Sequence, residues 1–213
     1  MRTVAFFIGL CVALSSEMAQ AASVMFEVAD EDGHPVANAV VALSSSAQTA
    51  PEPSSVQQII VDQRNEIFIP LVSILGRGGS VIFSNSDRVR HHVYSFSPIK
   101  QFQFILNPSE ISQPVKFDKI GVAAVGCNIH DKMVTYVYVT ETKWTALTRG
   151  DGSGVIASVP KGDYTVALWH PQLKPGVPPP SQTISVGTQP LNVPVTVQLV
   201  APTTMNGHHG SSY

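Results

Sequence analysis

One short stretch of the sequence carries three side chains that can bind a metal ion. Cys127, His130 and Met133 follow one another at C-x2-H-x2-M spacing. They bring a thiol, an imidazole and a thioether onto one loop, and the strand-like run Val134 to Val139 follows at once. Soft sulfur donors favour copper, and two histidines and a cysteine with a weak axial methionine form the blue-copper ligand set. The spacing therefore predicts three of the four ligands of a copper site.

A second histidine must come from elsewhere, and two neighbouring candidates lie upstream. His91 and His92 follow a predicted strand over Val81–Phe83 and a polar turn. Adjacent strand residues point to opposite faces of a sheet, so only one of the pair is expected to reach the metal. The predicted site therefore combines one of these two histidines with Cys127, His130 and Met133. His170 has no comparable partners and is interpreted as structural, and His208 and His209 lie in a polar tail.

The spacing of these residues resembles the plastocyanins, pseudoazurins and amicyanins, which are cupredoxins. Those proteins have an Asn six residues before the first histidine ligand, as Asn85 precedes His91 here. The resemblance therefore implies His91 rather than His92 as the ligand, and the site His91, Cys127, His130 and Met133. Their ligand loops read C-x2-H-x2-M or C-x2-H-x4-M, and the shorter form resembles amicyanin. The resemblance covers about residues 56 to 140 and implies a Greek-key sandwich with one mononuclear type 1 copper. It departs at Asp131 and Lys132, where amicyanin-like loops carry apolar or proline residues.

The elements that must hold these ligands read as strands. Segments of period two, rich in Val, Ile, Tyr and Thr, recur between turn residues, and we find no amphipathic helix. Further strands are expected over Val24–Val28, Val36–Leu43, Tyr164–Trp169 and Leu191–Leu199. Pro194 lies in the last of these, which places that strand at a sheet edge. The fold class is all-β, with short strands arranged as a sandwich.

The two flanks of the chain resemble one further family when they are read together. The run Phe26 to Val41 resembles the first hairpin of carboxypeptidase-regulatory-like domains, which are transthyretin-like sandwiches. Thr148, the turn Asp151 to Gly154 and the run Pro160 to Val166 resemble the continuation. We therefore expect a discontinuous sandwich, with the cupredoxin of residues 56–140 inserted between its parts, residues 23–50 and 141–200. The alternative is a cupredoxin that uses residues 24–43 itself and precedes a separate C-terminal sandwich.

The ends of the chain and its composition bear on location. Residues 1–21 combine a positive start, an apolar run and Ala-Gln-Ala, which is typical of a cleaved signal peptide. Residues 201–213 read as a flexible tail. Cleavage would remove Cys11 and leave Cys127 as a single thiol, so no internal disulfide is expected. The formal net charge of −2 and the lack of basic clusters argue against nucleic acid as a partner.

These observations predict a periplasmic protein that carries one electron between redox partners, such as a cytochrome or a dehydrogenase. The layout also resembles exported bacterial proteins labelled methylamine utilization proteins. No nucleophile or base stands out, so we do not expect an enzyme, and no membrane insertion is expected. The alternative is copper delivery or storage, or a recognition module that has no electron-transfer role.

Overall fold

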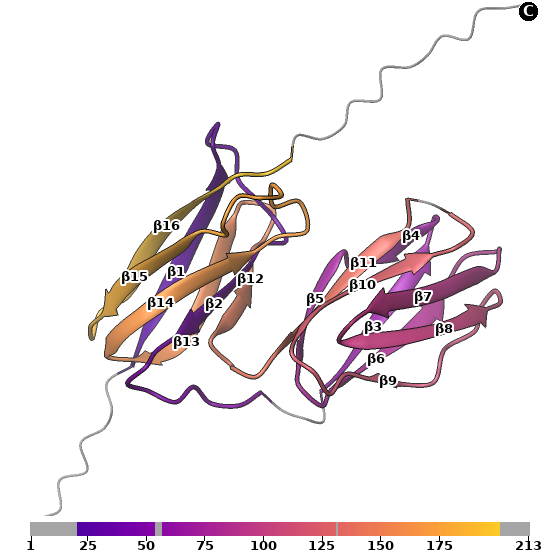
Figure 1. Ribbon diagram of the computed structural model, residues 1–213, viewed down its shortest axis with the longest axis horizontal. Helices are drawn as coiled ribbons and strands as arrows, with labels where there is room; N and C mark the ends of the chain where they lie inside the picture. Colours follow the sequence, from indigo (N-terminus) through magenta and orange to yellow (C-terminus); the bar gives the residue numbers. More distant parts are fainter. Residues whose placement is uncertain (1–20, 54–56, 131, 201–213) are drawn as a thin grey trace, which may run out of the picture.

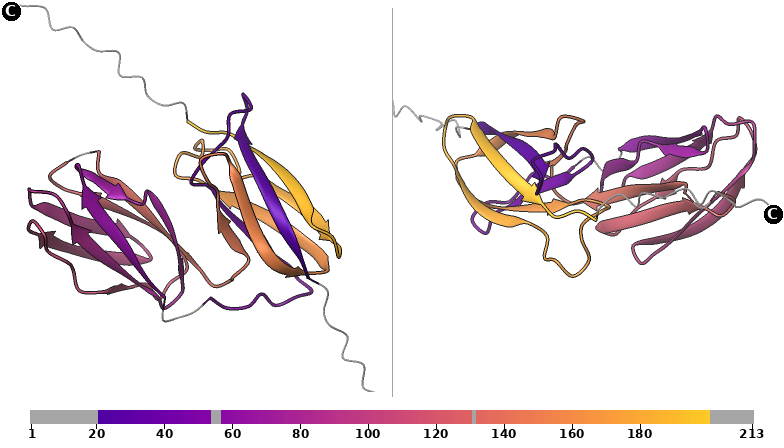
Figure 2. Two further views of the ribbon diagram at one scale, coloured as in Figure 1. Left: turned by 180° about the vertical axis from the view of Figure 1, so that it is seen from behind. Right: turned by 90° about the horizontal axis from the view of Figure 1, so that it is seen from above.

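The computed structural model describes residues 21–53, 57–130 and 132–200, and these residues are all-β (Figure 1). The predicted signal peptide and tail lie outside the described residues, apart from Ala21. None of the described residues forms a helix that could cross a membrane. The strands form two sandwiches that lie side by side, as the views in Figure 2 show.

Residues from both flanks of the chain build the first of these, here called the flanking sandwich. One sheet has the order β13-β1-β16 and the other has the order β12-β2-β14-β15. Its strands are β1 (Ala21–Asp30), β2 (Val40–Ser44), β12 (Thr145–Leu147), β13 (Ser153–Pro160), β14 (Gly162–Trp169), β15 (Ser181–Val186) and β16 (Leu191–Val197). Val24 pairs with Leu191 and with Ile156, and Val41 pairs with Leu168. Contacts between the first hairpin and the C-terminal strands are thus present.

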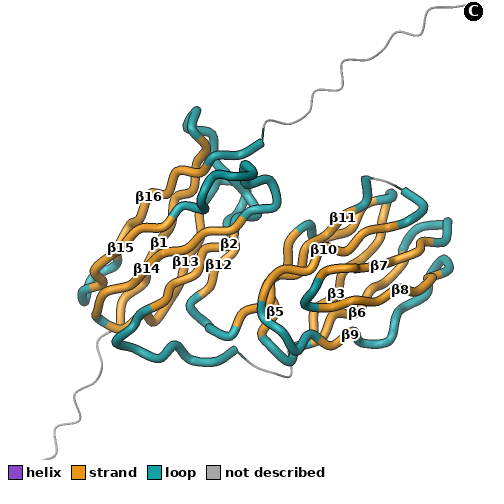
Figure 3. Tube along the Cα trace, viewed as in Figure 1, coloured by secondary structure: helices purple, strands orange, loops and turns teal. Residues whose placement is uncertain are grey.

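The middle of the chain builds the second, here called the central sandwich. A five-stranded sheet of order β5-β11-β10-β7-β8 packs on a four-stranded sheet of order β4-β3-β6-β9. Its strands are β3 (Gln58–Arg64), β4 (Ile67–Ile69), β5 (Val72–Gly76), β6 (Ser80–Asn85), β7 (His91–Ser97), β8 (Lys100–Leu106), β9 (Val115–Lys116), β10 (Gly121–Cys127) and β11 (Val134–Thr140). Figure 3 shows the connection between β10 and β11 at one end of these strands.

Each sandwich has a separate apolar core, and the alternating pattern of the strands explains it. In β1, Val24, Phe26 and Val28 are buried while their neighbours are more exposed. Those three side chains join one cluster of buried apolar residues with Leu43 and Tyr164. Val61, Phe83, Val93, Val125 and Val137 belong to another cluster, which also contains Cys127 and Met133. The predicted site therefore lies against a close-packed core, which limits the movement of its side chains.

Thr148 ties the two flanks of the chain together. Its backbone N–H donates to the Ala39 carbonyl, and its buried hydroxyl accepts from Ala39 N at 2.9 Å and donates to Val36 O at 2.7 Å. Gly152 lies at φ +76°, and an added Cβ would stand 2.4 Å from the Val28 carbonyl oxygen, so this turn requires glycine. Tyr164 donates its hydroxyl to Pro160 O. The sequence motifs of the flanks are therefore points of contact within the flanking sandwich.

Candidate metal centre

The loop from Cys127 to Met133 closes on itself between two paired strands. Cys127 is the last residue of β10, and Met133 directly precedes β11. The Cys127 N–H donates to the Met133 carbonyl at 3.2 Å, and the Met133 N–H donates to the His130 carbonyl at 3.0 Å. Both hydrogen bonds fix the loop at its base. Asp131 lies outside the described residues.

The pairing of β7 with β10 brings the upstream histidine to this loop. Cys127 lies opposite Val93, two residues beyond His91 on β7. The His91 Nδ1 is 3.6 Å from the Cys127 Sγ, and the His130 Nδ1 is 3.8 Å from the same sulfur. The ligand atoms of the three residues all lie within 4.8 Å of one another. Three of the four predicted site residues therefore converge on one point.

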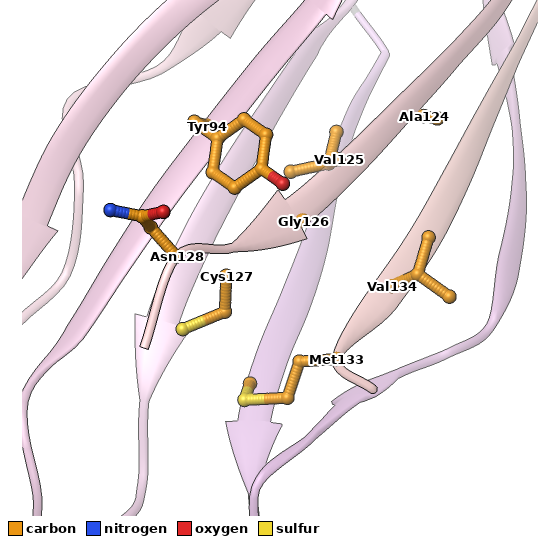
Figure 4. Close-up of a pocket in the computed structure, with 8 residues that line it drawn as sticks. All are labelled: Tyr94, Ala124, Val125, Gly126, Cys127, Asn128, Met133 and Val134. Atoms are coloured by element: carbon orange, nitrogen blue, oxygen red, sulfur yellow. The ribbon is translucent and has the colours of Figure 1, made fainter. Parts of the chain in front are cut away.

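Burial differs among the residues of the site in a way that bears on access. His91 is fully buried, and Cys127 and Met133 are 3% and 2% exposed. His130 is the partly exposed member, since 24% of its side-chain surface reaches solvent. Figure 4 shows the Met133 side chain beside that of Cys127, with the two sulfur atoms toward the same side. The structure places Met133 next to the cluster, lining a hollow with Cys127, Gly126 and Tyr94.

A carboxylate that the sequence analysis did not single out orients His91. The Asp87 Oδ2 is 2.9 Å from the His91 Nε2, on the far side of the ring from Cys127. Asp87 also accepts the backbone N–H groups of Asn65 and Glu66. Burial raises the pKa of Asp87, but the hydrogen bonds from Glu66, His91 and Asn65 outweigh it and hold the pKa below its ordinary value. Asp87 is therefore an ionised acceptor at neutral pH.

Two further polar residues hold this end of the sandwich. Asn85 donates its amide to the Val89 and Leu106 carbonyls, and its Oδ1 accepts the Asp87 N–H. The Glu66 carboxylate lies 3.7 Å from the His130 Nε2. Asn85 was noted in the sequence for its spacing alone, whereas Asp87 and Glu66 were missed. The Asp87-x3-His91 spacing is the one sequence signal for Asp87, and it is too common to be specific, whereas Glu66 has no comparable signal.

The other histidines lie apart from the site. His92 is half-buried on the opposite face of β7, where its ring is 6.5 Å from that of Tyr94. The buried His170 accepts the Gln172 N–H at Nδ1, so its Nε2 carries the proton and donates to Ala37 O. His34 contacts Asp30 in an exposed turn with Asp32. His208 and His209 lie outside the described residues.

The donor set can be tested against the metal that it implies. A thiol and two imidazole nitrogens surround one point, and a buried thioether lies beside them. Zinc sites use cysteine, histidine and carboxylate ligands, whereas a thioether is a donor for copper. Within the described residues no carboxylate joins this cluster, because Asp87 and Glu66 meet the far nitrogens of the rings. The residues present fit a copper ion.

Comparison with known proteins gives similarity to solved structures alone. A purple cupredoxin from Nitrosopumilus maritimus is 22% identical, with a TM-score of 0.35, over 38% of this chain and 98% of that one. Amicyanin from Paracoccus versutus is 15% identical, with a TM-score of 0.36, over 46% of this chain and 97% of that one. A copper-containing nitrite reductase from Thermus scotoductus SA-01 is 24% identical, with a TM-score of 0.37, over 46% of this chain and 25% of its own. No family model and no curated protein matches. Because these TM-scores lie below 0.5, the assignment of the site depends on its geometry.

Proposed function

We propose that the protein is a type 1 copper protein that carries one electron between redox partners in the periplasm. The observation that supports this most directly is the convergence of His91 Nδ1, His130 Nδ1 and Cys127 Sγ beside the buried Met133. Copper bound there would supply a one-electron redox couple. Cys127 would hold it as thiolate, His91 and His130 would hold it through neutral imidazole nitrogens, and the Met133 thioether would be a further, weaker ligand.

The residues around the ligands favour electron transfer over exchange of the metal. His91, Cys127 and Met133 are almost completely buried, and hydrogen bonds fix both the ligand loop and the His91 ring. A framework of this kind holds one geometry for two oxidation states, because side chains in a close-packed core have few alternative positions. A delivery role would instead need ligands that a partner can reach.

His130 is the residue through which an electron would enter and leave. Its ring contacts the Cys127 sulfur on one side and is partly open to solvent on the other. The partner would be another periplasmic redox protein, such as a cytochrome or a dehydrogenase, and no nucleic acid is involved. No substrate is transformed in this proposal, so the protein would not be an enzyme.

Absorption and electron paramagnetic resonance spectra of the copper-loaded mature chain test the proposal. We expect an intense visible thiolate-to-copper band and a narrow copper hyperfine splitting, because Cys127 would hold the copper as thiolate beside two imidazoles. A Cys127→Ser variant should lose the band. A colourless protein, or an ordinary tetragonal copper signal in the wild type, would contradict the proposal.

A further inference from the structure

Asp87 occupies a position from which one carboxylate contacts two separate parts of the metal centre. It lies in the turn between β6 and β7, four residues before His91, and its side chain is 11% exposed. One oxygen accepts from Asn65 N. The other is 3.0 Å from Glu66 N and 2.9 Å from His91 Nε2. The Asp87 N–H donates to Asn85, which holds the turn from the other side. All of these partners lie at the same end of the central sandwich.

The contact with His91 decides which ring nitrogen carries the proton. Both oxygens of the Asp87 carboxylate accept backbone N–H groups, so the carboxylate is the acceptor and the His91 Nε2 donates to it. In a neutral imidazole the other nitrogen, Nδ1, then has a free lone pair. That nitrogen faces the Cys127 sulfur at 3.6 Å, where a metal ligand is needed. A carboxylate that accepts a hydrogen bond from a metal-binding histidine fixes the tautomer of the ring and makes it a stronger metal ligand.

The contact with the β3–β4 turn extends the same control to His130. Asn65 and Glu66, the two residues between these strands, have φ angles of 55° and 59°, which is the left-handed region. Asn tolerates this region, but Glu rarely adopts it, so the turn needs support from elsewhere. Asp87 supplies that support by accepting both N–H groups. This turn places the Glu66 carboxylate 3.7 Å from the His130 Nε2.

We propose that Asp87 is the positioning residue of the metal centre. It orients His91 directly and His130 through the Asn65–Glu66 turn. The effect on copper rests on the proposed function, whereas the effect on the His91 tautomer does not. A negative charge behind one ligand stabilises Cu(II) more than Cu(I), so Asp87 lowers the reduction potential of the centre.

The first measurement uses the metal-free wild-type chain and requires no variant. Nitrogen-15 NMR of the histidine rings, at a pH where His91 is neutral, should show the proton on the His91 Nε2. A proton on Nδ1 would overturn the proposal. This result does not depend on whether the protein binds copper in the cell, so failure here and failure of the proposed function are distinguishable.

The second measurement replaces the carboxylate. Asp87→Asn removes the charge and one acceptor oxygen, so we expect a mixture of His91 tautomers and copper binding that is about 10- to 100-fold weaker. The loss of affinity should be greater for Cu(II) than for Cu(I). Each tenfold difference between these two losses corresponds to a rise of about 59 mV in reduction potential. Asp87→Glu keeps the charge and should restore the tautomer. An unchanged tautomer and potential in Asp87→Asn would overturn the proposal.

The third measurement separates the turn from the charge. Glu66→Gly removes the carboxylate beside His130 but keeps the N–H that Asp87 accepts, and glycine suits the left-handed region. We expect an unchanged His91 tautomer and altered His130 ring signals. A His130 spectrum identical to the wild type would refute the part of the proposal that concerns His130.

Glu110→Gln is the matched control for all of these variants. Glu110 also accepts a backbone N–H and a side-chain amide, both from Asn107, but it contacts neither histidine. The Glu110→Gln variant should leave the histidine tautomers and the reduction potential unchanged. A shift in Glu110→Gln as large as that in Asp87→Asn would show that the loss of any carboxylate at this end of the sandwich has the same effect, and would overturn the proposal.

Discussion

His91 and His92 show how one step along a strand separates a proposed ligand from a half-buried residue on the opposite face. His91 is fully buried with Nδ1 toward Cys127, whereas His92 faces the other side of β7 beside Tyr94. We expect His91→Gln to abolish the visible band of the copper-loaded protein, because the site would lose one of its two imidazole nitrogens. His92→Gln should keep it. Absorption spectra at equal copper loading check both, and a lost band in His92→Gln alone would reverse the assignment.

Met133 offers a milder change at the same site. Met133→Leu conserves volume in a position that is 2% exposed, so the cost in stability should be under about 1.5 kcal/mol. We expect the visible band to remain, because the thiolate is unchanged, and the reduction potential to rise, because Cu(II) would lose the thioether of Met133. Voltammetry of the two proteins measures the shift. Equal potentials would mean that Met133 does not bind the metal.

The residues that sequence reasoning found and missed differ in a physical way. Cys127, His130 and Met133 share one loop, so their spacing was readable, and the alternation of strands separated His91 from His92. Asp87 supports the turn that contains Glu66, and this turn lies about twenty residues upstream of Asp87. The type of turn that they stabilise is usually marked by Asn-Gly, whereas Asn65 is followed here by Glu66. Contacts of this kind depend on strand pairing and leave no local pattern.

At the scale of elements, alternation of apolar residues was the most reliable signal. The predicted strands Val81–Phe83 and Tyr164–Trp169 lie within β6 and β14, and the strand that contains Pro194 is indeed an edge strand, β16. The predicted strand Val36–Leu43 was placed too early, since β2 begins at Val40. Its first residues instead form the Thr148 contacts, and no sequence rule for strands describes such side-chain bonds.

Thr148 gives a prediction at this scale. Thr148→Val keeps the shape but leaves Ala39 N and Val36 O without the hydroxyl, and each buried group without a partner costs about 1–3 kcal/mol. We expect the free energy of unfolding to fall by that order in a denaturant titration. Thr165→Val, at an exposed position of β14, is the control and should change it by less than about 0.5 kcal/mol. Equal effects of the two changes would contradict this role of Thr148.

At the scale of the whole molecule, the two sandwiches meet through aromatic side chains. Trp169 of β14 packs against Tyr136 and Tyr138 of β11, with ring centroids 5.6 Å and 5.9 Å apart.

Next to Trp169, burial holds the pKa of His170 below its ordinary value, although its hydrogen bond to Ala37 O acts in the opposite direction. His170 is therefore neutral in the folded protein near neutral pH.

This burial predicts a pH dependence of stability. The unfolded chain protonates His170 near its ordinary pKa of about 6.5, whereas the folded chain does so at lower pH. The unfolded state thus binds more protons as pH falls below about 6.5, and the contribution of His170 to stability is lost over that range. Denaturant titrations at pH 8 and pH 5 give the free energy of unfolding at each pH. The difference between the two values should be smaller for His170→Gln than for the wild type. An equal difference would contradict the prediction.

The hydrogen bond from Lys143 N to Pro51 O joins the chain entering the central sandwich to the chain leaving it. This closeness affects the order in which the protein can fold. β1 and β2 are made first, yet most of their pairing partners follow more than 100 residues later, as the contact of Ala39 with Thr148 illustrates. Once the central sandwich has folded, its close ends shorten the loop that must be closed, which lowers the entropic cost of joining the flanks. Until the C-terminal strands are made and join them, the edges of β1 and β2 are unpaired, so we expect the nascent chain to be most open to aggregation before that stage.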